Sequence, residues 1–331
     1  MLNRRATLLA AVSGALAAAL APGAPRAAGP PAIRIGMLRF GTVSWELDVI
    51  RRHGLDAAAG VAVEAVPFAG AQATQVALQA GSVDMTVQDW LWVSRQRASG
   101  ADWTLVPFST AVGAIVAPPG SPVHEVPDLR GRRLGVAGSP LDKSWLIVRA
   151  YAERRYQLDL DSAVDKSFAA PPLLAAELEH GRLDAALTFW PFAAKAEAAG
   201  MRRVLAVEDA IQGLGIPPGV PITGYVFSEK WAGRNRELVT AFFAAARQAR
   251  ELLATSDAEW ETLRPLTGAA SDAELEQLRD YYRRGIPRRW GPAEQQAAGE
   301  LYAILAKIGG PALVGPATAL APGTFWQAET A

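Results

Sequence analysis

The stretch LQAGSVDMTVQDW at residues 78–90 combines the end of a helix, a turn at Gly81 and an apolar strand that stops at a tryptophan. The stretch LEHGRLDAALTFW at residues 178–190 has the same pattern, L-x-x-G-x-x-D-x-x-x-x-x-W. A glycine after a helix, followed by an apolar run of strand length, is typical of a helix-to-strand connection in an α/β sheet. A structural reason is needed for a tryptophan at the end of a buried strand in both stretches.

More residues recur at the same offset of one hundred positions. Two adjacent lobes with the same order of elements would explain the matches, and similar packing needs in two unrelated lobes are the alternative. The matched residues are Ser44, Trp45, Phe68, Ala69, Leu78, Gly81, Asp84 and Trp90, which correspond to Ser144, Trp145, Phe168, Ala169, Leu178, Gly181, Asp184 and Trp190.

Strand and helix signals alternate from residue 32 onward. AIRIGMLRF, which starts at residue 32, has the two-residue period of a strand, and TVSWELDVIRRHG, which starts at residue 42, has the start and stop signals of a helix. The same order restarts near residue 132. Strands separated by helices favour parallel pairing, so we predict an α/β fold with a mostly parallel sheet in each lobe. From about residue 235 the chain is helical, and we expect these helices to pack on lobe one.

The 331 residues are long for one core and suit two lobes. Residues 104–120 and 221–228 have the character of crossing segments between lobes. We therefore predict lobe one at residues 32–112 and 223–331, and lobe two at residues 113–222. Two crossing strands would form a natural hinge.

The N-terminus has the pattern of a signal peptide. Arg4 and Arg5 precede a short apolar run, and proline, glycine and alanine follow it. We predict a signal peptide at residues 1–28, with the twin-arginine and the general secretory routes both open, and therefore export to the periplasm. The chain has no cysteine, which excludes disulfides, thiol catalysis and the acylated cysteine of a lipoprotein anchor.

The composition argues against several function classes. Lys plus Arg and Asp plus Glu both number 33, so we expect no attraction to nucleic acid. His53, His124 and His180 are scattered without metal-ligand spacing, and no G-x-S-x-G motif or phosphate-binding loop occurs. We therefore expect a protein that is not an enzyme and has no cofactor or metal.

Four segments carry a resemblance to a known family. They are PFAGAQATQVALQAGSVDMTV (67–87), VPDLRGRRLGVAGSP (126–140), LEHGRLDAALTFWPF (178–192) and PITGYVFSEKW (221–231). They resemble periplasmic solute-binding proteins of ABC importers, in the branch that serves sulfonate, taurine, nitrate and thiamine precursors.

The resemblance implies the two-lobe type II periplasmic-binding-protein fold. It also implies a clamp, expected to be a monomer, that hands a small molecule to an ABC permease in the inner membrane. An exported ligand sensor is the alternative. Thiamine-pyrimidine synthases of this fold depend on a cysteine-rich motif, which this chain lacks.

Ligands of open α/β sheets bind beyond the carboxyl ends of the strands, where helix N-termini favour anions. We favour a sulfonate- or carboxylate-like anion, and a heterocycle or a quaternary amine on aromatic faces is the alternative. Other roles compete with ligand contact: helix capping for the serines and Asp89, a surface position for Arg39, and core packing for the tryptophans. Asp84 and Asp184 are interpreted as turn residues. The candidate ligand-binding residues are Arg39, Phe40, Gly41, Thr42, Trp45, Gly70, Gln88, Asp89, Trp90, Gly138, Ser139, Lys143, Trp145 and Trp190.

Overall fold

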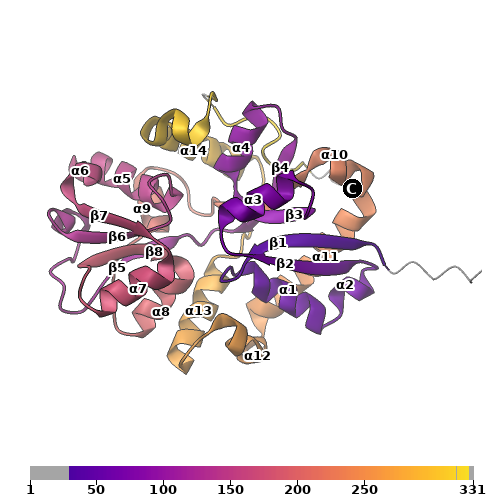
Figure 1. The fold of residues 1–331 in the computed structure, drawn as a ribbon, viewed down its shortest axis with the longest axis horizontal. Helices are drawn as coiled ribbons and strands as arrows, with labels where there is room; N and C mark the ends of the chain where they lie inside the picture. Colours follow the sequence, from indigo (N-terminus) through magenta and orange to yellow (C-terminus); the bar gives the residue numbers. More distant parts are fainter. Residues whose placement is uncertain (1–29, 318, 328–331) are drawn as a thin grey trace, which may run out of the picture.

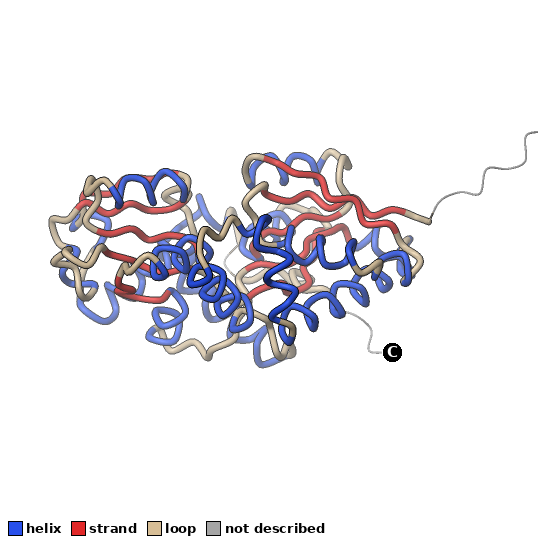
Figure 2. The backbone as a smooth tube through the Cα atoms, turned by 90° about the horizontal axis from the view of Figure 1, so that it is seen from below, coloured by secondary structure: helices blue, strands red, loops and turns tan. Residues whose placement is uncertain are grey.

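The computed structural model describes residues 30–317 and 319–327. The predicted signal peptide at residues 1–28 lies outside the described residues. Two groups of strands lie side by side with helices around each of them (Figure 1). Figure 2 shows the same two groups from below, with the strands of each forming one twisted layer.

The first sheet has the strand order β2-β1-β3-β10-β4. Helices α1 to α4 belong to the same part of the chain. The bounds are β1 (Ala32–Leu38), α1 (Val43–Arg52), α2 (Leu55–Ala58), β2 (Ala62–Phe68), α3 (Ala71–Gln79), β3 (Met85–Asp89), α4 (Trp90–Ala98), β4 (Trp103–Ser109) and β10 (Thr223–Ser228).

The second sheet has the strand order β7-β6-β8-β5-β9. A short 3₁₀ helix at Val126–Leu129 precedes β6. The other bounds are β5 (Gly113–Ala117), β6 (Arg133–Ala137), α5 (Lys143–Tyr156), α6 (Leu160–Ala163), β7 (Asp165–Ala169), α7 (Pro171–Glu179), β8 (Ala185–Phe189), α8 (Trp190–Ala198), β9 (Arg202–Ala206) and α9 (Val207–Gly213).

The two sheets have the same topology. In each sheet the first three strands of the order are parallel, and an antiparallel strand then separates them from the last one. That antiparallel strand is β10 in the first sheet and β5 in the second. The prediction of two mostly parallel α/β sheets is confirmed, and the shared topology accounts for the repeat at an offset of one hundred. The lobe boundaries stay a prediction.

The repeated aspartate has a structural role in both sheets. Asp84 accepts hydrogen bonds from the backbone N–H of Arg34 at 2.9 Å and from its guanidinium at 2.7 Å. Asp184 accepts the same pair of bonds from Arg133, at 2.8 and 2.7 Å. Each aspartate ties the middle one of the three parallel strands, β1 or β6, to the turn before β3 or β8. The interpretation of both residues as turn residues agrees with these contacts.

The last part of the chain is helical, as predicted. Helices α11 and α12 pack on α1, and α14 packs on α4, so this part covers the first sheet. However, α13 also contacts α8 and α14 also contacts α5, both of which belong to the second sheet. In Figure 1, α14 lies above and α13 below the junction of the two sheets. The bounds are α10 (Glu229–Arg234), α11 (Arg236–Thr255), α12 (Asp257–Thr267), α13 (Asp272–Arg284) and α14 (Pro292–Val314).

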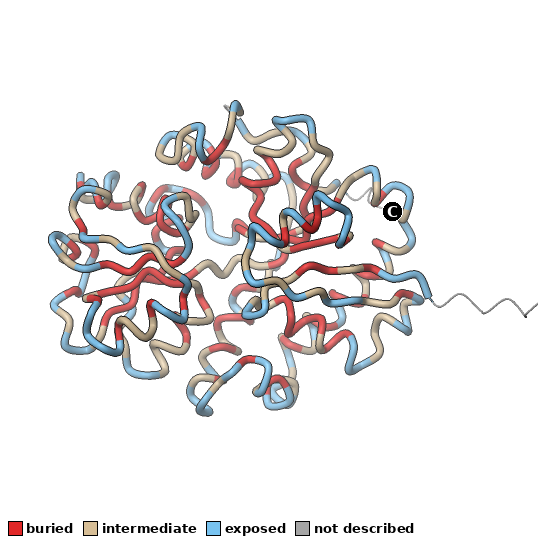
Figure 3. Tube along the Cα trace, viewed as in Figure 1, coloured by how far each residue is buried: buried red, intermediate tan, exposed pale blue. Residues whose placement is uncertain are grey.

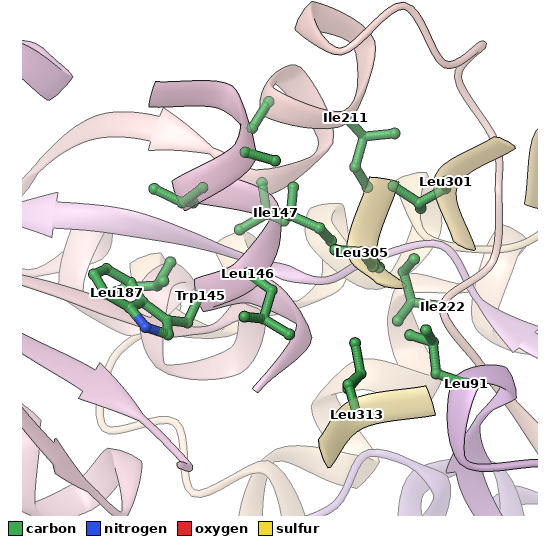
Figure 4. Close-up of a cluster of buried hydrophobic side chains, with 14 of the residues drawn as sticks. Leu91, Trp145, Leu146, Ile147, Leu187, Ile211, Ile222, Leu301, Leu305 and Leu313 are labelled. Atoms are coloured by element: carbon green, nitrogen blue, oxygen red, sulfur yellow. The ribbon is translucent and has the colours of Figure 1, made fainter. Parts of the chain in front are cut away.

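Helix α14 is apolar and long enough to cross a membrane by length and composition. Its path breaks at Gly310, whose φ of 60° and ψ of −163° are not helical. Figure 4 shows Leu313 beside Leu91 of α4, Leu305 toward Leu146 of α5, and Leu301 beside Ile211 of α9. Figure 3 shows further buried residues along the strands. We therefore assign α14 to the protein core, where it joins the two halves.

Candidate ligand-binding site

A cavity of about 250 Å³ lies between the two sheets. It is bounded by the carboxyl ends of β1, β3, β4 and β8 and by the first turns of α1, α3, α5 and α8. This is where the sequence places the ligand, since strand ends and helix starts meet there. The lining residues are Met37, Leu38, Phe40, Gly41, Thr42, Val43, Ala71, Val87, Gln88, Asp89, Phe108, Ser109, Ala111, Val112, Asp142, Lys143, Ser144, Phe189, Trp190, Pro191, Phe192, Ile222 and Thr223.

Half of the candidate residues line this cavity. They come from the loop after β1, the end of β3, the start of α5 and the start of α8: Phe40, Gly41, Thr42, Gln88, Asp89, Lys143 and Trp190. Sequence reasoning misses the phenylalanines Phe108, Phe189 and Phe192. Phe108 and Phe189 also stand near strand ends, so the rule that selected the tryptophans could have found them.

Three of the candidate tryptophans lie in the core and not on the cavity. Trp90 and Trp145 are fully buried, and Trp45 is buried against Trp190 and Trp260 with ring centroids 5.6 Å away in both cases. None of the three is in the lining of the described cavity, so the structure lends no support to ligand contact by these rings. A ring in the first turn of a helix can point either into the cavity or into the core. The rings of these three tryptophans pack in the core.

The two tryptophans that end equivalent strands have similar packing partners. Trp90 lies 6.4 Å from Tyr302 of α14 between ring centroids, and its indole N–H donates to the carbonyl of Pro221 at 2.7 Å. Trp190 stacks on Tyr281 of α13 at 6.1 Å and 13°. Each repeated tryptophan therefore contacts a C-terminal helix that bridges the two sheets. Trp190 also reaches the cavity.

Four further candidates lie outside the cavity lining. Arg39 is exposed in the turn after β1, and Gly70 precedes α3. Gly138 has a φ of 93°, a conformation that favours glycine, which explains its presence in the turn after β6. The Ser139 hydroxyl accepts from the backbone N–H of Leu141 at 3.3 Å, so Ser139 shapes that turn. A strand-end loop is longer than the part of it that lines the cavity, and ligand contact by these four residues stays a prediction.

Lys143 and Asp89 form an ion pair in the cavity wall. The Lys143 Nζ lies 2.7 Å from Asp89 Oδ2, and Asp89 Oδ1 accepts from the backbone N–H of Trp92 at 2.8 Å. Burial opposes the charged form of Lys143, but the carboxylates of Asp89 and Asp142 outweigh it and raise the pKa of Lys143. Burial raises the pKa of Asp142, whose carboxylate caps α5 by accepting from the N–H of Ser144 at 2.9 Å.

Three helix starts at the cavity, those of α1, α3 and α8, have no side-chain cap, but in α8 the Trp190 N–H already bonds to the carbonyl of Val112 and Pro191 has no N–H. Helix α1 follows Thr42 and helix α3 follows Gly70, and neither of these residues makes a side-chain capping bond. The first N–H groups of a helix lack intrahelical acceptors and carry partial positive charge. Helices α4 and α5, in contrast, are capped by Asp89 and Asp142. An anionic group is therefore best accommodated at the starts of α1 and α3.

A buried polar cluster fixes α1 below the cavity. Glu46 is fully buried, and its carboxylate accepts from the Arg250 guanidinium at 2.7 Å and from the Tyr225 hydroxyl at 2.7 Å. Burial opposes the charge on Arg250, but Glu46 raises the pKa of Arg250. Gln88 is fixed in a similar way, since its amide donates to Thr74 at 2.7 Å. The cavity is thus built on elements held by buried hydrogen bonds.

Comparison with known proteins supports the fold. A family model described as "NMT1/THI5 like" matches residues 51–259. No curated protein matches the chain. The alkanesulfonate-binding protein SsuA from Xanthomonas axonopodis pv. citri, bound to MOPS, has 21% sequence identity and a TM-score of 0.69. That match covers 91% of this chain and 100% of the other.

Two further solved structures are similar. The periplasmic aliphatic sulphonate binding protein SsuA from Escherichia coli has 19% identity and a TM-score of 0.69, over 90% of this chain and 98% of that one. A cysteine-to-serine mutant of DSZB in complex with biphenyl-2-sulfinic acid has 16% identity and a TM-score of 0.59, over 88% and 95%. These likenesses confirm the periplasmic-binding-protein fold that the sequence motifs predict.

Proposed function

Because the chain belongs to the NMT1/THI5-like family, we propose that it is the periplasmic solute-binding component of an ABC importer. The observation that carries the proposal is the cavity between the two sheets, at the carboxyl ends of strands from both. A ligand in this position contacts both halves and stabilises their closed arrangement by its differential affinity. The predicted signal peptide and the sulfonate-binding structural neighbours support the same role.

The proposed ligand is a small organic anion with an apolar part. The cavity volume of about 250 Å³ is below the range of about 300–1,000 Å³ typical of drug-sized ligands. Its anionic group would accept from the N–H groups at the starts of α1 and α3. Its apolar part would lie on the rings of Phe40, Phe108 and Trp190, which line the cavity. Lys143 is already paired with Asp89, so backbone dipoles supply most of the positive potential.

A quaternary amine or a cationic heterocycle is the second candidate. Asp89, Asp142 and Lys143 line the cavity, and two of these three charges are negative when ionised. Aromatic faces around a carboxylate also suit a cation. A thermal-shift panel of sulfonates, carboxylates, heterocycles and betaines, followed by titration calorimetry, separates the two candidates. Binding of betaines without binding of sulfonates or carboxylates would exclude the anion.

Transport and sensing differ in the membrane partner. An importer component stimulates the ATPase activity of its permease complex when loaded with ligand, whereas a sensor acts on a membrane receptor. The test is ATP hydrolysis by the permease complex in proteoliposomes, with and without the loaded protein. Loaded protein that leaves hydrolysis at its basal rate would favour the sensor. We expect the protein to act as a monomer and to have no catalytic activity of its own, in keeping with the lack of cysteine.

A further inference from the structure

A second cavity of about 370 Å³ lies on the side of the second sheet. Its walls come from β8, α7 and α8, and the turn between α12 and α13 borders it at Gly268 and Ala270. Most of its lining is apolar, including Val116, Leu174 and Met201. It is larger than the cavity assigned to the ligand.

Phe192 lines both cavities. It is the third residue of α8, and its ring lies 6.5 Å from that of Phe40, at an interplanar angle of 73°. Ala196 and Ala199 line the second cavity and follow at helical spacings of four and seven residues. One face of α8 therefore runs along the second cavity, and Phe192 stands at the end of that face toward the first.

The second cavity also holds a buried polar group without a partner. Thr188 lines it and is 4% exposed, and its hydroxyl oxygen has no hydrogen-bond partner among the described residues. Such a group is costly unless something hydrogen-bonds to it. At the border, the Lys195 ammonium donates to the carbonyl of Gly268 at 2.6 Å, and burial lowers the pKa of Lys195. The second cavity is thus an apolar space with one free hydroxyl on its wall.

We propose that Phe192 divides one ligand space into two and sets the maximum length of the ligand. With the ring in place, the first cavity takes a ligand with a short apolar part. Without the ring, the apolar part extends along α8 into the second cavity, toward Thr188. This inference rests on the proposed solute-binding function and adds a residue that determines which members of the ligand class bind.

The test is titration calorimetry with linear alkanesulfonates of increasing chain length. For the parent protein, affinity should rise with each methylene until the first cavity is full and then fall. For Phe192→Ala, the maximum should move to longer chains, with about fourfold in affinity for each further buried methylene. Ala196→Phe added to Phe192→Ala fills the second cavity and should return the maximum to the parent length. Phe40→Ala serves as a control that weakens binding at all lengths without moving the maximum.

A second measurement needs no ligand. Xenon enters dry apolar cavities, so crystals of the parent under xenon should show separate sites in the two cavities. Crystals of Phe192→Ala should show an additional site where the ring stood. An unchanged length maximum in a folded Phe192→Ala variant, or no xenon at that position, overturns the partition. If the parent binds no member of the series, the proposed anionic ligand fails, and the xenon sites still decide whether Phe192 separates the cavities.

Discussion

The ammonium nitrogen of Lys143 lies 2.7 Å from a carboxylate oxygen of Asp89, and the two residues come from different sheets. Asp89 ends β3 of the first sheet, and Lys143 begins α5 beside the second. The pair therefore joins the two halves in the wall of the cavity. Asp89 is 7% exposed, and its carboxylate oxygens contact this partner and the backbone N–H of Trp92.

The losses of stability from removing each member of this pair should not be additive. Lys143→Met leaves the Asp89 carboxylate without its cation and should lower the free energy of unfolding by about 1–3 kcal/mol. In Lys143→Met combined with Asp89→Asn, the loss should be smaller than the sum of the two single losses. Urea unfolding of the four proteins measures the coupling. Purely additive losses would mean that the pair contributes nothing beyond its separate parts.

Phe40→Ala should reduce ligand affinity with little loss of stability. Phe40 is 40% exposed and lines the cavity, so its ring contributes to binding more than to the core. We expect affinity to fall about tenfold, in line with the loss of about 1–2 kcal/mol of apolar contact. Titration calorimetry with the ligand found by thermal shift measures this. Leu173→Ala is the matched control, because Leu173 is 55% exposed and is not in the cavity lining.

Trp90→Phe should cost more stability than Trp145→Phe. Both indoles are fully buried, but only the Trp90 N–H has a described acceptor, the carbonyl of Pro221. Loss of that bond leaves a buried carbonyl without its donor, and we expect a difference of about 1 kcal/mol in the free energy of unfolding. Chemical denaturation gives the difference. Ligand affinity should stay at the parent value in both variants, and a clear drop in either one would return that tryptophan to the binding site.

Asp184→Asn should show a stability loss that depends on pH. The Arg133 guanidinium lowers the pKa of Asp184 by hydrogen bonding, while burial acts in the opposite direction without cancelling it. A carboxyl with a lowered pKa in the folded state stabilises the protein above its unfolded pKa of about 3.8, and this contribution disappears as the pH falls through the folded value. We expect a loss of about 1 kcal/mol at pH 7 that shrinks as the pH falls below the unfolded pKa and through the lower folded value.

Unfolding at a series of pH values measures this dependence. Asp272→Asn is the control, because the side chain of Asp272 is 97% exposed in its pair with Arg264 and should contribute little at any pH. An Asp184→Asn loss that stays constant from pH 7 to pH 2 would contradict the assigned cause.

The sequence predicts the sheets and the location of the cavity because these follow from local patterns. The helix predicted after Asp89 begins at Trp90, as the capping residue indicates. Glycines such as Gly81 and Gly181, with φ near 70°, mark the turns before the third strands. A strand end that is followed by a helix start can therefore be predicted from the sequence alone.

Whether a strand-end tryptophan points into the cavity or into the core cannot be predicted from the sequence in the same way. Trp90 and Trp190 occupy equivalent positions, yet only Trp190 reaches the cavity, because α14 covers Trp90. This covering is a contact between residues far apart in the chain. The partners of Asp89 show the same difference. Its capping bond is local and can be predicted, whereas its ion pair with Lys143 joins the two halves of the fold and cannot.

The position of β10 has a consequence for the order in which the chain assembles. This strand lies between β3 and β4, although the whole second sheet separates it from them in the sequence. During synthesis or export the second sheet is complete by residue 206, while the first still has a gap between β3 and β4 with two open edges. Contacts of such long sequence separation form slowly. We therefore expect the second half of the fold to form first, and a chain ending before Thr223 to keep the second sheet while the first stays unassembled.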